Sequence, residues 1–415
     1  MKKHIYLDHA ATTPTDPRVV KAMTPYWTKN FGNPSSLYHI GQQAKNTLDN
    51  SRLTVANIFH SQPEEVIFTG GGTESINLAI KGVVAASRLM PAHIITSNFE
   101  HHAVLNAVQT LKNQGHEVSL IPVDEDGLLI QEKLWSAIQD NTILISIMMA
   151  NNEVGTIEPI QEIGANLEKI NKIRKEKNLP HIFLHTDACQ AAGAQELNVD
   201  KLHVDLMSIN GSKIYGPKGV GVLYVRRGTP VKALIDGGGQ EKNLRSGTEN
   251  IPGIVGLATA LNIAEQNREK ENKRLSTLRD WLIKKLLTTI PKTLLNGHPS
   301  KRLANNINIS ILDIEGEAML LYLDEIGIQA STGSACTAQD LEPSHVIRAL
   351  GRPYEAAHGS LRLTLGRDTT KDDLVFLAKK LPGIVKYLRQ VSPINVDMKT
   401  LHSSIKKYPR EIIKL

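Results

Sequence analysis

Short apolar runs alternate with longer stretches of helical periodicity between residues 65 and 226. The longer stretches, such as "ESINLAIKGVVAASRL", repeat apolar residues every three or four positions, which predicts helices. Strands separated by helices predict βαβ crossovers and a mainly parallel sheet with both faces covered. Ligands bind such sheets beyond the carboxyl ends of the strands, so the residues that follow each strand are the candidates for chemistry. The predicted strands are "EVIFT", "HIITS", "EVSLIPV", "TILISIMMA", "HIFLHTDA", "DLMSIN" and "GVGVLYV".

A second pattern follows the predicted sheet. One helical stretch covers about residues 254–290, and the remainder mixes strand segments such as "NNINISIL" and "SLRLTLG" with helices. This pattern predicts a smaller α/β domain that a long helix connects to the first.

The composition is that of a soluble globular protein, with 415 residues of which 41% are hydrophobic and 22% charged. Two cysteines exclude a disulfide scaffold and a four-cysteine metal site. Every apolar run falls short of the roughly 18 residues that a membrane-spanning helix needs. The start, "MKKHIYLDHA", has no apolar signal core. We therefore expect a cytoplasmic protein with reduced thiols and no membrane partner.

The charge is uneven along the chain. The formal net charge is +6, and the segment from Val396 onward carries a surplus of three positive charges. A basic tail can attract an acidic protein, RNA or an anionic membrane. We expect a solvated terminal segment instead, because that is the usual behaviour of termini.

Two motifs predict contacts with a cofactor. "FTGGGTES" places Gly71, Gly72 and Thr73 between a strand and a helix, which fits either a phosphate cradle or a plain tight turn. "INGSKIYGPKGVG" places Lys213 just after a strand, where a lysine among small residues fits a Schiff-base role. Lys218 in the same motif is the competing candidate. We prefer Lys213 because it is nearer the strand end.

The motif "HTDACQ" is open to three interpretations. Alternation along a strand would put His185, Asp187 and Cys189 on one face, as in a metal site. Alternatively, Asp187 would hold a cationic ring nitrogen of a cofactor, or it would simply cap the next helix. These six residues alone favour the cap, with Cys189 as a small buried residue.

Further polar residues stand at predicted strand ends. His101 and His102 lie at a strand-to-helix junction, where an imidazole can stack on a ligand, transfer a proton or cap the helix. Arg362 lies within a strand, where an inward guanidinium commonly binds a carboxylate. A phosphate cradle, Asp187, His101 and Lys213 are together the parts of a pyridoxal phosphate (PLP) site.

The ordered series of motifs closely resembles the cysteine desulfurases of the IscS/NifS type, which are fold type I PLP enzymes of the class-V aminotransferase family. The resemblance covers about residues 4–393. The motifs are "YLDHAATTP", "FGNPSS", "VIFTGGGTES", "EHHAV", "NNEVGT", "HTDACQ", "KIYGPKGVG", "RSGTEN", "STGSACTAQDLEPSHVIRALG" and "LRLTLGR".

The resemblance implies an α/β fold with a mainly parallel seven-stranded sheet and a smaller C-terminal α/β domain. The large PLP-binding domain would cover residues 16–262. Residues 1–15 and 263–415 would form the small domain, with the catalytic cysteine loop at about 331–345.

The resemblance also implies a role for each candidate residue. Lys213 would bind PLP covalently, and Asp187 would stabilise the protonated ring nitrogen. Gln190 would hydrogen-bond the ring hydroxyl, while His101 would stack on the ring and transfer protons. Cys336, whose small neighbours alone do not distinguish an inert thiol from a nucleophile, would accept sulfur as a persulfide. Gly72, Thr73, Asn210 and Ser212 would bind the phosphate, with Thr248 reaching it across a homodimer, and Asn152 and Arg362 would hold the substrate carboxylate.

The activity implied is conversion of L-cysteine to L-alanine. The sulfur would go to an acceptor protein such as an iron–sulfur scaffold, for cluster assembly or tRNA thiolation, without direct nucleic-acid contact. The rivals are a selenocysteine lyase or aminotransferase of the same fold type, a non-catalytic assembly scaffold, and a metal enzyme built on "HTDACQ".

Two regions depart from the family pattern. Asn210 and Ser212 stand where the family usually has serine and histidine before the lysine. Both replacements can still donate a hydrogen bond, so we expect altered phosphate contacts rather than loss of PLP. The chain after "VSPI" also differs, which leaves the identity of the acceptor open.

Overall fold

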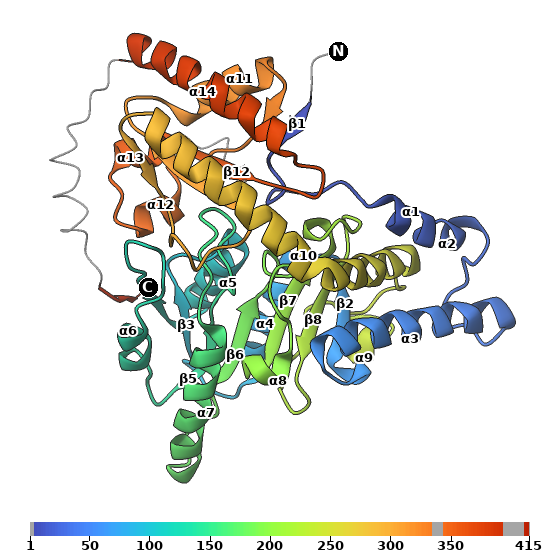
Figure 1. Ribbon diagram of the computed structural model, residues 1–415. Helices are drawn as coiled ribbons and strands as arrows, with labels where there is room; N and C mark the ends of the chain where they lie inside the picture. Colours follow the sequence, from blue (N-terminus) through green and yellow to red (C-terminus); the bar gives the residue numbers. More distant parts are fainter. Residues whose placement is uncertain (1–3, 334–342, 393–410, 415) are drawn as a thin grey trace.

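The computed structural model describes residues 4–333, 343–392 and 411–414. Over these ranges the chain forms an eight-stranded sheet between helices, with a smaller α/β unit beside it (Figure 1). Cys336 lies outside the described residues. Among the helices of the described ranges, none combines the length and the apolar character that crossing a membrane requires.

The central sheet contains all seven predicted strands. They are β2 (Val66–Thr69), β3 (His93–Ser97), β4 (Glu117–Ile121), β5 (Thr142–Ser146), β6 (Phe183–Asp187), β7 (Leu206–Asn210) and β8 (Gly221–Val225), and β13 (Ile413–Lys414) is the eighth. The order is β13-β4-β3-β5-β6-β7-β8-β2. The pairs from β4 to β7 are parallel, as predicted, and β8 runs antiparallel to β7 and β2. The carboxyl ends of β3, β5, β6 and β7 therefore meet at one edge.

The eighth strand comes from the C-terminal segment, which the sequence pattern does not predict as a strand. Ile413 pairs with Leu120, antiparallel to the edge strand β4. Ile412 packs against the apolar core, and the side chains of Lys133 and Glu411 form an ion pair at 3.1 Å. An edge strand carries unpaired N–H and C=O groups, and the backbone of Ile413 and Lys414 pairs with them while both side chains stay exposed to solvent.

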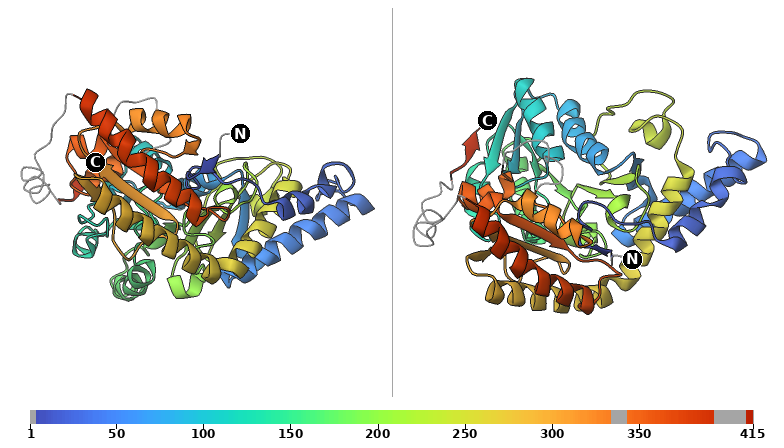
Figure 2. Two further views of the ribbon diagram at one scale, coloured as in Figure 1. Left: turned by 45° about the horizontal axis from the view of Figure 1, so that its top comes forward. Right: turned by 90° about the horizontal axis from the view of Figure 1, so that it is seen from above.

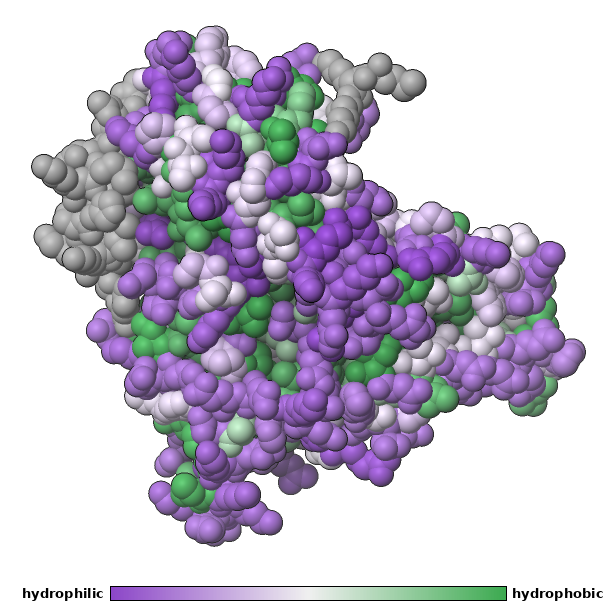
Figure 3. All heavy atoms as spheres, viewed as in Figure 1, coloured by the Kyte–Doolittle hydropathy of each residue, from purple (hydrophilic) through white to green (hydrophobic). Residues whose placement is uncertain are grey.

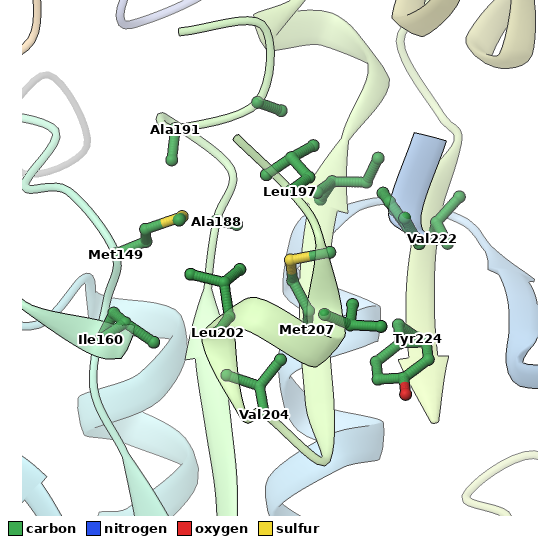
Figure 4. Close-up of a cluster of buried hydrophobic side chains, with 14 of the residues drawn as sticks. Met149, Ile160, Ala188, Ala191, Leu197, Leu202, Val204, Met207, Val222 and Tyr224 are labelled. Carbon is green, nitrogen blue, oxygen red and sulfur yellow. The ribbon is translucent and has the colours of Figure 1, made fainter. Parts of the chain in front are cut away.

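The strands distribute their side chains to two apolar layers. Val66 and Phe68 of β2 belong to one layer, and Ile67 between them belongs to the other, as strand alternation requires. Figure 4 shows part of the first layer, where Met207 and Tyr224 project from neighbouring strands. Helices α3 (His39–Phe59), α6 (Gln131–Ser136), α7 (Ile160–Glu176), α8 (Val199–Leu202) and the start of α10 (Ile251–Thr289) complete the first layer, and α4 (Gly72–Ala86) and α5 (His102–Asn113) cover the second. In Figure 1, α7 and α8 lie in front of the sheet and α4 lies behind it.

The smaller unit has its own apolar core. Its sheet has the antiparallel order β12-β10-β9, and a two-stranded parallel pair, β1 with β11, lies nearby. Helix α10 has 39 residues and contributes side chains to both cores, so it is the predicted connector. The division at residues 15/16 and 262/263 stays a prediction. The elements are β1 (Ile5–Tyr6), β9 (Thr293–Leu295), β10 (Asn306–Ile311), α11 (Gly316–Glu325), β11 (Ile328–Gln329), α12 (His345–Ala349), α13 (Tyr354–His358), β12 (Ser360–Thr364) and α14 (Lys371–Val391).

An arm projects from the body of the molecule. It consists of α1 (Pro17–Met23), α2 (Pro25–Thr28) and the start of α3, and both Figure 1 and Figure 2 show it extending away from the sheet. The far end of the arm mixes hydrophobic with hydrophilic residues in Figure 3. Its exposed apolar side chains are Val20, Trp27, Phe31, Leu37 and Tyr38.

A strained turn follows the sheet at α9 (Gln240–Asn243). Glu241, Lys242 and Asn243 have φ values of 47°, 60° and 63°, in the left-handed region that costs energy for side-chain residues. The buried carboxylate of Glu241 pairs with Arg52 at 2.6 Å and accepts a hydrogen bond from the Phe68 backbone N–H. These contacts hold the turn in place beside β2.

Candidate active site

A cavity of about 470 Å³ opens at the carboxyl ends of the parallel strands, where the fold class predicts a ligand. It lies between the central sheet and the smaller unit, and the N-terminal residues Ala10 and Ala11 also line it. The predicted site residues that line it are Gly72, Thr73, His101, Asn152, Asp187, Gln190, Asn210, Ser212, Lys213 and Arg362.

Lys213 enters the cavity from a 3₁₀ turn directly after β7. Its Nζ donates hydrogen bonds to the backbone carbonyl oxygens of Ala10, at 2.7 Å, and Ala11, at 2.6 Å. The competing lysine, Lys218, is exposed and is not among the residues that line the cavity. The geometry therefore favours Lys213 over Lys218 as the lysine that acts on a bound ligand.

Asp187 ends β6 and is buried at the cavity wall. Its Oδ1 accepts a hydrogen bond from the Cys189 backbone N–H at 2.9 Å, which fixes the carboxylate. Gln190, one turn further, donates from Nε2 to the Ala10 carbonyl oxygen at 3.0 Å. A fixed carboxylate here can hold a cationic ring nitrogen.

The glycine turn after β2 lies at the cavity, where it leads into a helix. Gly71 has φ 151°, and helix α4 begins at Gly72 with its N-terminus at the cavity. A Cβ atom on Gly72 would lie 2.8 Å from Cys189 Sγ and 3.2 Å from Asn210 Cβ, so only glycine fits. The backbone N–H groups at this helix start are suited to an anion.

Asn210 and Ser212, the two residues that depart from the family pattern, lie beside the same glycine turn. Asn210 Oδ1 accepts a hydrogen bond from the Ser212 backbone N–H at 3.3 Å. Asn210 and Ser212 line an open hollow together with Thr73 at the start of α4. Hydroxyl and amide donors thus surround the helix N-terminus, a donor set that suits a phosphate group.

His101 is the N-cap of α5, and its Nδ1 accepts a hydrogen bond from the Ala103 backbone N–H at 3.0 Å. In the neutral ring the proton is therefore on Nε2. Burial lowers the pKa of His101, while the Asp187 carboxylate opposes this and Lys213 adds to it. The histidine is thus held neutral beside the candidate lysine.

Sequence reasoning missed His345, which lines the cavity and packs against the segment that carries His101. Its ring centroid is 4.6 Å from that of His102, and its Nε2 donates to the Glu100 carbonyl oxygen at 2.8 Å. Burial lowers the pKa of both His102 and His345. The only signal in the sequence is its place at the start of a helix after the cysteine motif.

Arg362 is the candidate carboxylate ligand on β12, with a side chain only 2% exposed. Its Nη1 donates to the carbonyl oxygens of Asn152, at 3.3 Å, and Gly333, at 3.4 Å, and its Nη2 pairs with Asp8 Oδ1 at 2.8 Å. Among the described residues, neither Arg362 Nε nor Asn152 Oδ1 has a hydrogen-bond partner, although both atoms are buried. Buried polar groups without a hydrogen-bond partner are unusual in proteins, which makes these two atoms candidates for ligand binding.

The metal interpretation of "HTDACQ" finds no support in the geometry. Strand β6 ends at Asp187, so Cys189 lies in the following turn and off the strand face. His185 is buried between the hydroxyls of Ser146, at 2.8 Å, and Ser208, at 3.0 Å, and burial lowers its pKa to about 4. Within the described ranges, no three His, Cys, Asp or Glu side chains are grouped to hold a metal ion.

One predicted site residue of the described ranges, Thr248, is not brought to this cavity. Thr248 is exposed and is not among the residues that line the cavity in this chain. Cys336 lies outside the described residues. Gly333 and Ser344 flank that segment, and a Cβ on Gly333 would lie 2.8 Å from Ser344 Cβ. Ser344 Oγ donates to the carboxylate of Glu153, which lines the cavity, so Ser344 lies directly behind one cavity residue.

Comparison with known proteins agrees with this geometry. The family model described as "Aminotransferase class-V" matches residues 5–377. A curated relative, "Cysteine desulfurase IscS" of Methanosarcina thermophila, is 51% identical over 392 residues, which are 94% of each chain. The chain belongs to the class-V aminotransferases and, among them, to the cysteine desulfurases.

Two solved structures share the fold. A structure titled "NIFS-LIKE PROTEIN" superposes with a TM-score of 0.86 at 35% identity, covering 93% of this chain and all of that one. A second, titled "SspA in complex with cysteine", has a TM-score of 0.73 at 32% identity and covers 87% of this chain and 98% of that one. The α/β fold with a mainly parallel central sheet and a smaller C-terminal unit, predicted for this cysteine desulfurase from its sequence, is confirmed.

Proposed function

We propose that this cysteine desulfurase converts L-cysteine to L-alanine with PLP bound in the cavity, and that Cys336 receives the sulfur. The observation that carries the proposal is the convergence of Lys213, Asp187 and the N-terminus of α4 on one cavity. The relative solved "in complex with cysteine" supports the choice of substrate.

The cavity fits PLP in each of its chemical parts. The helix N-terminus with Thr73, Asn210 and Ser212 would hold the phosphate, in a cradle that a Cβ on Gly72 would fill. Asp187 would pair with the ring nitrogen. When bound, PLP supplies an electron sink for the electron pair that the substrate α-carbon releases. Gln190 would hydrogen-bond the ring hydroxyl, and His101 would lie against the ring.

The protein's own residues would bind and orient the amino acid. Arg362 Nε, which is buried and has no partner among the described residues, would donate to the substrate carboxylate, and the side-chain NH₂ group of Asn152 would donate to the same carboxylate. Lys213 would bind the cofactor covalently and later take the α-proton. The carbonyl oxygens of Ala10 and Ala11 would stabilise its ammonium form.

The proposed sulfur transfer takes place between the thiol of L-cysteine and the thiol of Cys336. The thiolate of Cys336 attacks the sulfur of L-cysteine, the carbon–sulfur bond breaks, and the protein keeps a persulfide while L-alanine leaves. The neutral imidazole of His101 would accept and return the protons that this exchange moves. Gly333 and Ser344 lie next to Glu153, which lines the cavity, and this supports delivery of Cys336 to the substrate.

A homodimer and a sulfur-acceptor protein complete the proposal. The exposed apolar side chains of the arm, including Trp27, Phe31 and Leu37, support a protein–protein contact there. Thr248 would reach the phosphate across that dimer. We keep the division into a large domain, residues 16–262, and a small domain, residues 1–15 and 263–415, as part of the proposal. The acceptor would be a protein such as an iron–sulfur scaffold.

Product analysis tests this function. The purified holoenzyme incubated with L-cysteine should form L-alanine, and in the presence of a thiol reductant it should form sulfide in equal amount. Cys336→Ser should abolish both products while keeping the PLP absorbance. 3-Mercaptopyruvate in place of alanine would favour an aminotransferase, because transamination leaves the sulfur on the substrate, and a protein that binds no PLP would favour a scaffold.

A further inference from the structure

The carboxylate of Asp8 lies on the guanidinium that we assign to the substrate carboxylate. Asp8 Oδ1 is 2.8 Å from Arg362 Nη2, and the exposed fractions of the two side chains are 17% and 2%. Water screens such an ion pair only weakly. Asp8 therefore neutralises much of the charge of Arg362 before any substrate arrives.

The backbone fixes Asp8 in this position. Asp8 forms a parallel bridge with Thr364, two residues beyond Arg362 on the same segment. The Thr364 N–H donates to the Leu7 carbonyl oxygen at 2.7 Å, and the Tyr6 hydroxyl donates to the Asp8 carbonyl oxygen at 3.0 Å. The ion pair is thus built into the pairing of the N-terminal segment with the end of β12.

The guanidinium keeps part of its binding capacity. A guanidinium has five N–H donors. Nη1 is directed to the carbonyl oxygens of Asn152 and Gly333, and one N–H of Nη2 is directed to Asp8. The Nε donor has no partner among the described residues. A second carboxylate can therefore bind to Arg362, but only beside the carboxylate of Asp8.

We propose that Asp8 is a specificity-determining residue that competes with the carboxylate of the amino acid for Arg362. The inference rests on the proposed function, since it takes Arg362 as the carboxylate site. Two carboxylates that share one buried cation repel each other, which weakens the binding of both substrate and product. Only a ligand whose amine also bonds in the cavity compensates for this repulsion. Because the repulsion also weakens the binding of the product, L-alanine is released after each turnover.

The test compares two ligands that differ only in the carboxylate. Absorbance titration of the PLP-loaded enzyme with L-alanine and with ethylamine gives a dissociation constant for each. Asp8→Asn keeps the size of the side chain and its hydrogen bond to Arg362 but removes the charge. We expect the constant for L-alanine to fall about five- to tenfold, as for loss of a nearby like charge in a partly buried site. The constant for ethylamine should not change.

Three further variants complete the experiment. Asp8→Ser removes the same charge and should also lower the dissociation constant for L-alanine. It provides a second test of the charge if Asp8→Asn folds poorly. Asp16→Asn removes a carboxylate from the same N-terminal segment, where it pairs with Arg367 at 2.9 Å, and should leave the L-alanine constant unchanged. Arg362→Gln should weaken L-alanine binding without affecting ethylamine.

The results separate two claims, the competition by Asp8 and the assignment of Arg362 as the carboxylate site. Unchanged or weaker L-alanine binding in both Asp8 variants overturns the competition, and so does equal tightening in Asp16→Asn. If Arg362→Gln leaves L-alanine binding unchanged, the proposed carboxylate site itself is wrong. Weaker binding in Arg362→Gln without tightening in the Asp8 variants overturns only the inference about Asp8.

Discussion

The amine of Lys213 lies 2.6 Å from the carbonyl oxygen of Ala11, a residue 202 positions earlier in the chain. The Ala10 carbonyl oxygen accepts from both Lys213 and Gln190. A carbonyl oxygen only accepts hydrogen bonds, so the amine must donate, and these contacts favour its ammonium form. The N-terminal segment thus positions the candidate lysine from across the cavity.

The first prediction concerns this lysine. Lys213→Ala should abolish covalent attachment of PLP and lower alanine formation from L-cysteine by about a thousandfold or more, because the amine acts in both steps. Borohydride reduction followed by peptide mass mapping measures the attachment. The matched control is Lys218→Ala, which removes an exposed lysine of the same motif and should keep both attachment and rate. PLP found on Lys218 would contradict the assignment.

The second prediction concerns the close packing at Gly72. Gly72→Ala should weaken PLP binding about tenfold, since its Cβ would meet Cys189 Sγ at 2.8 Å and such overpacking costs about 1–3 kcal/mol. Cys189→Ala in the same chain should restore part of the affinity by removing the sulfur. Equilibrium dialysis of PLP provides the measurement.

Gly383→Ala is the control for this substitution. Gly383 lies within α14, and a Cβ there would have nothing within 4 Å, so PLP binding should not change. Loss of affinity in Gly72→Ala that Cys189→Ala does not relieve would show that the contact with the sulfur is not the cause.

The third prediction concerns the pH dependence of stability. Burial raises the pKa of Glu100, whose ordinary value is 4.5, to about 8, against hydrogen bonds from Ser97 and the Met148 N–H that favour the charged form. The folded protein keeps a proton that the unfolded chain releases. The stability from this group is therefore complete below pH 4.5 and is lost as pH rises through about 8.

Melting temperatures between pH 5 and pH 9 test this sign. Glu100→Gln should show a smaller fall in melting temperature over this range than the unmodified protein. Burial also raises the pKa of Glu158 to about 8. Glu158→Gln should therefore also show a smaller fall in melting temperature than the unmodified protein. Parallel curves for the protein and both variants would mean that these carboxyls are charged in the fold.

The sequence predicts the sheet and most of the cavity because both depend on local patterns. Apolar runs with period-two alternation mark the strands, and polar residues directly after them, such as Asp187 and Lys213, must meet at one edge of a parallel sheet. The metal interpretation fails for an equally local reason. Strand β6 ends at Asp187, so alternation does not extend to Cys189.

The features that the sequence does not predict are contacts between distant segments. The Asp8–Arg362 pair joins residues 354 positions apart, and neither position carries a local signal for the other. The docking of Ile413 on β4 depends on an open sheet edge rather than on the tail's own pattern. His345 faces His102 only because the smaller unit closes over the sheet.

The central claim is that sulfur passes from L-cysteine to Cys336, and mass spectrometry of the protein after incubation with L-cysteine tests it most directly. Cys189 provides the comparison within the same chain, because burial and the Asp187 carboxylate raise the pKa of its thiol and keep it protonated. The account predicts a gain of one sulfur atom on the peptide that contains Cys336, with none on the peptide that contains Cys189. Added sulfur on Cys189, or no added sulfur while alanine forms, would contradict it.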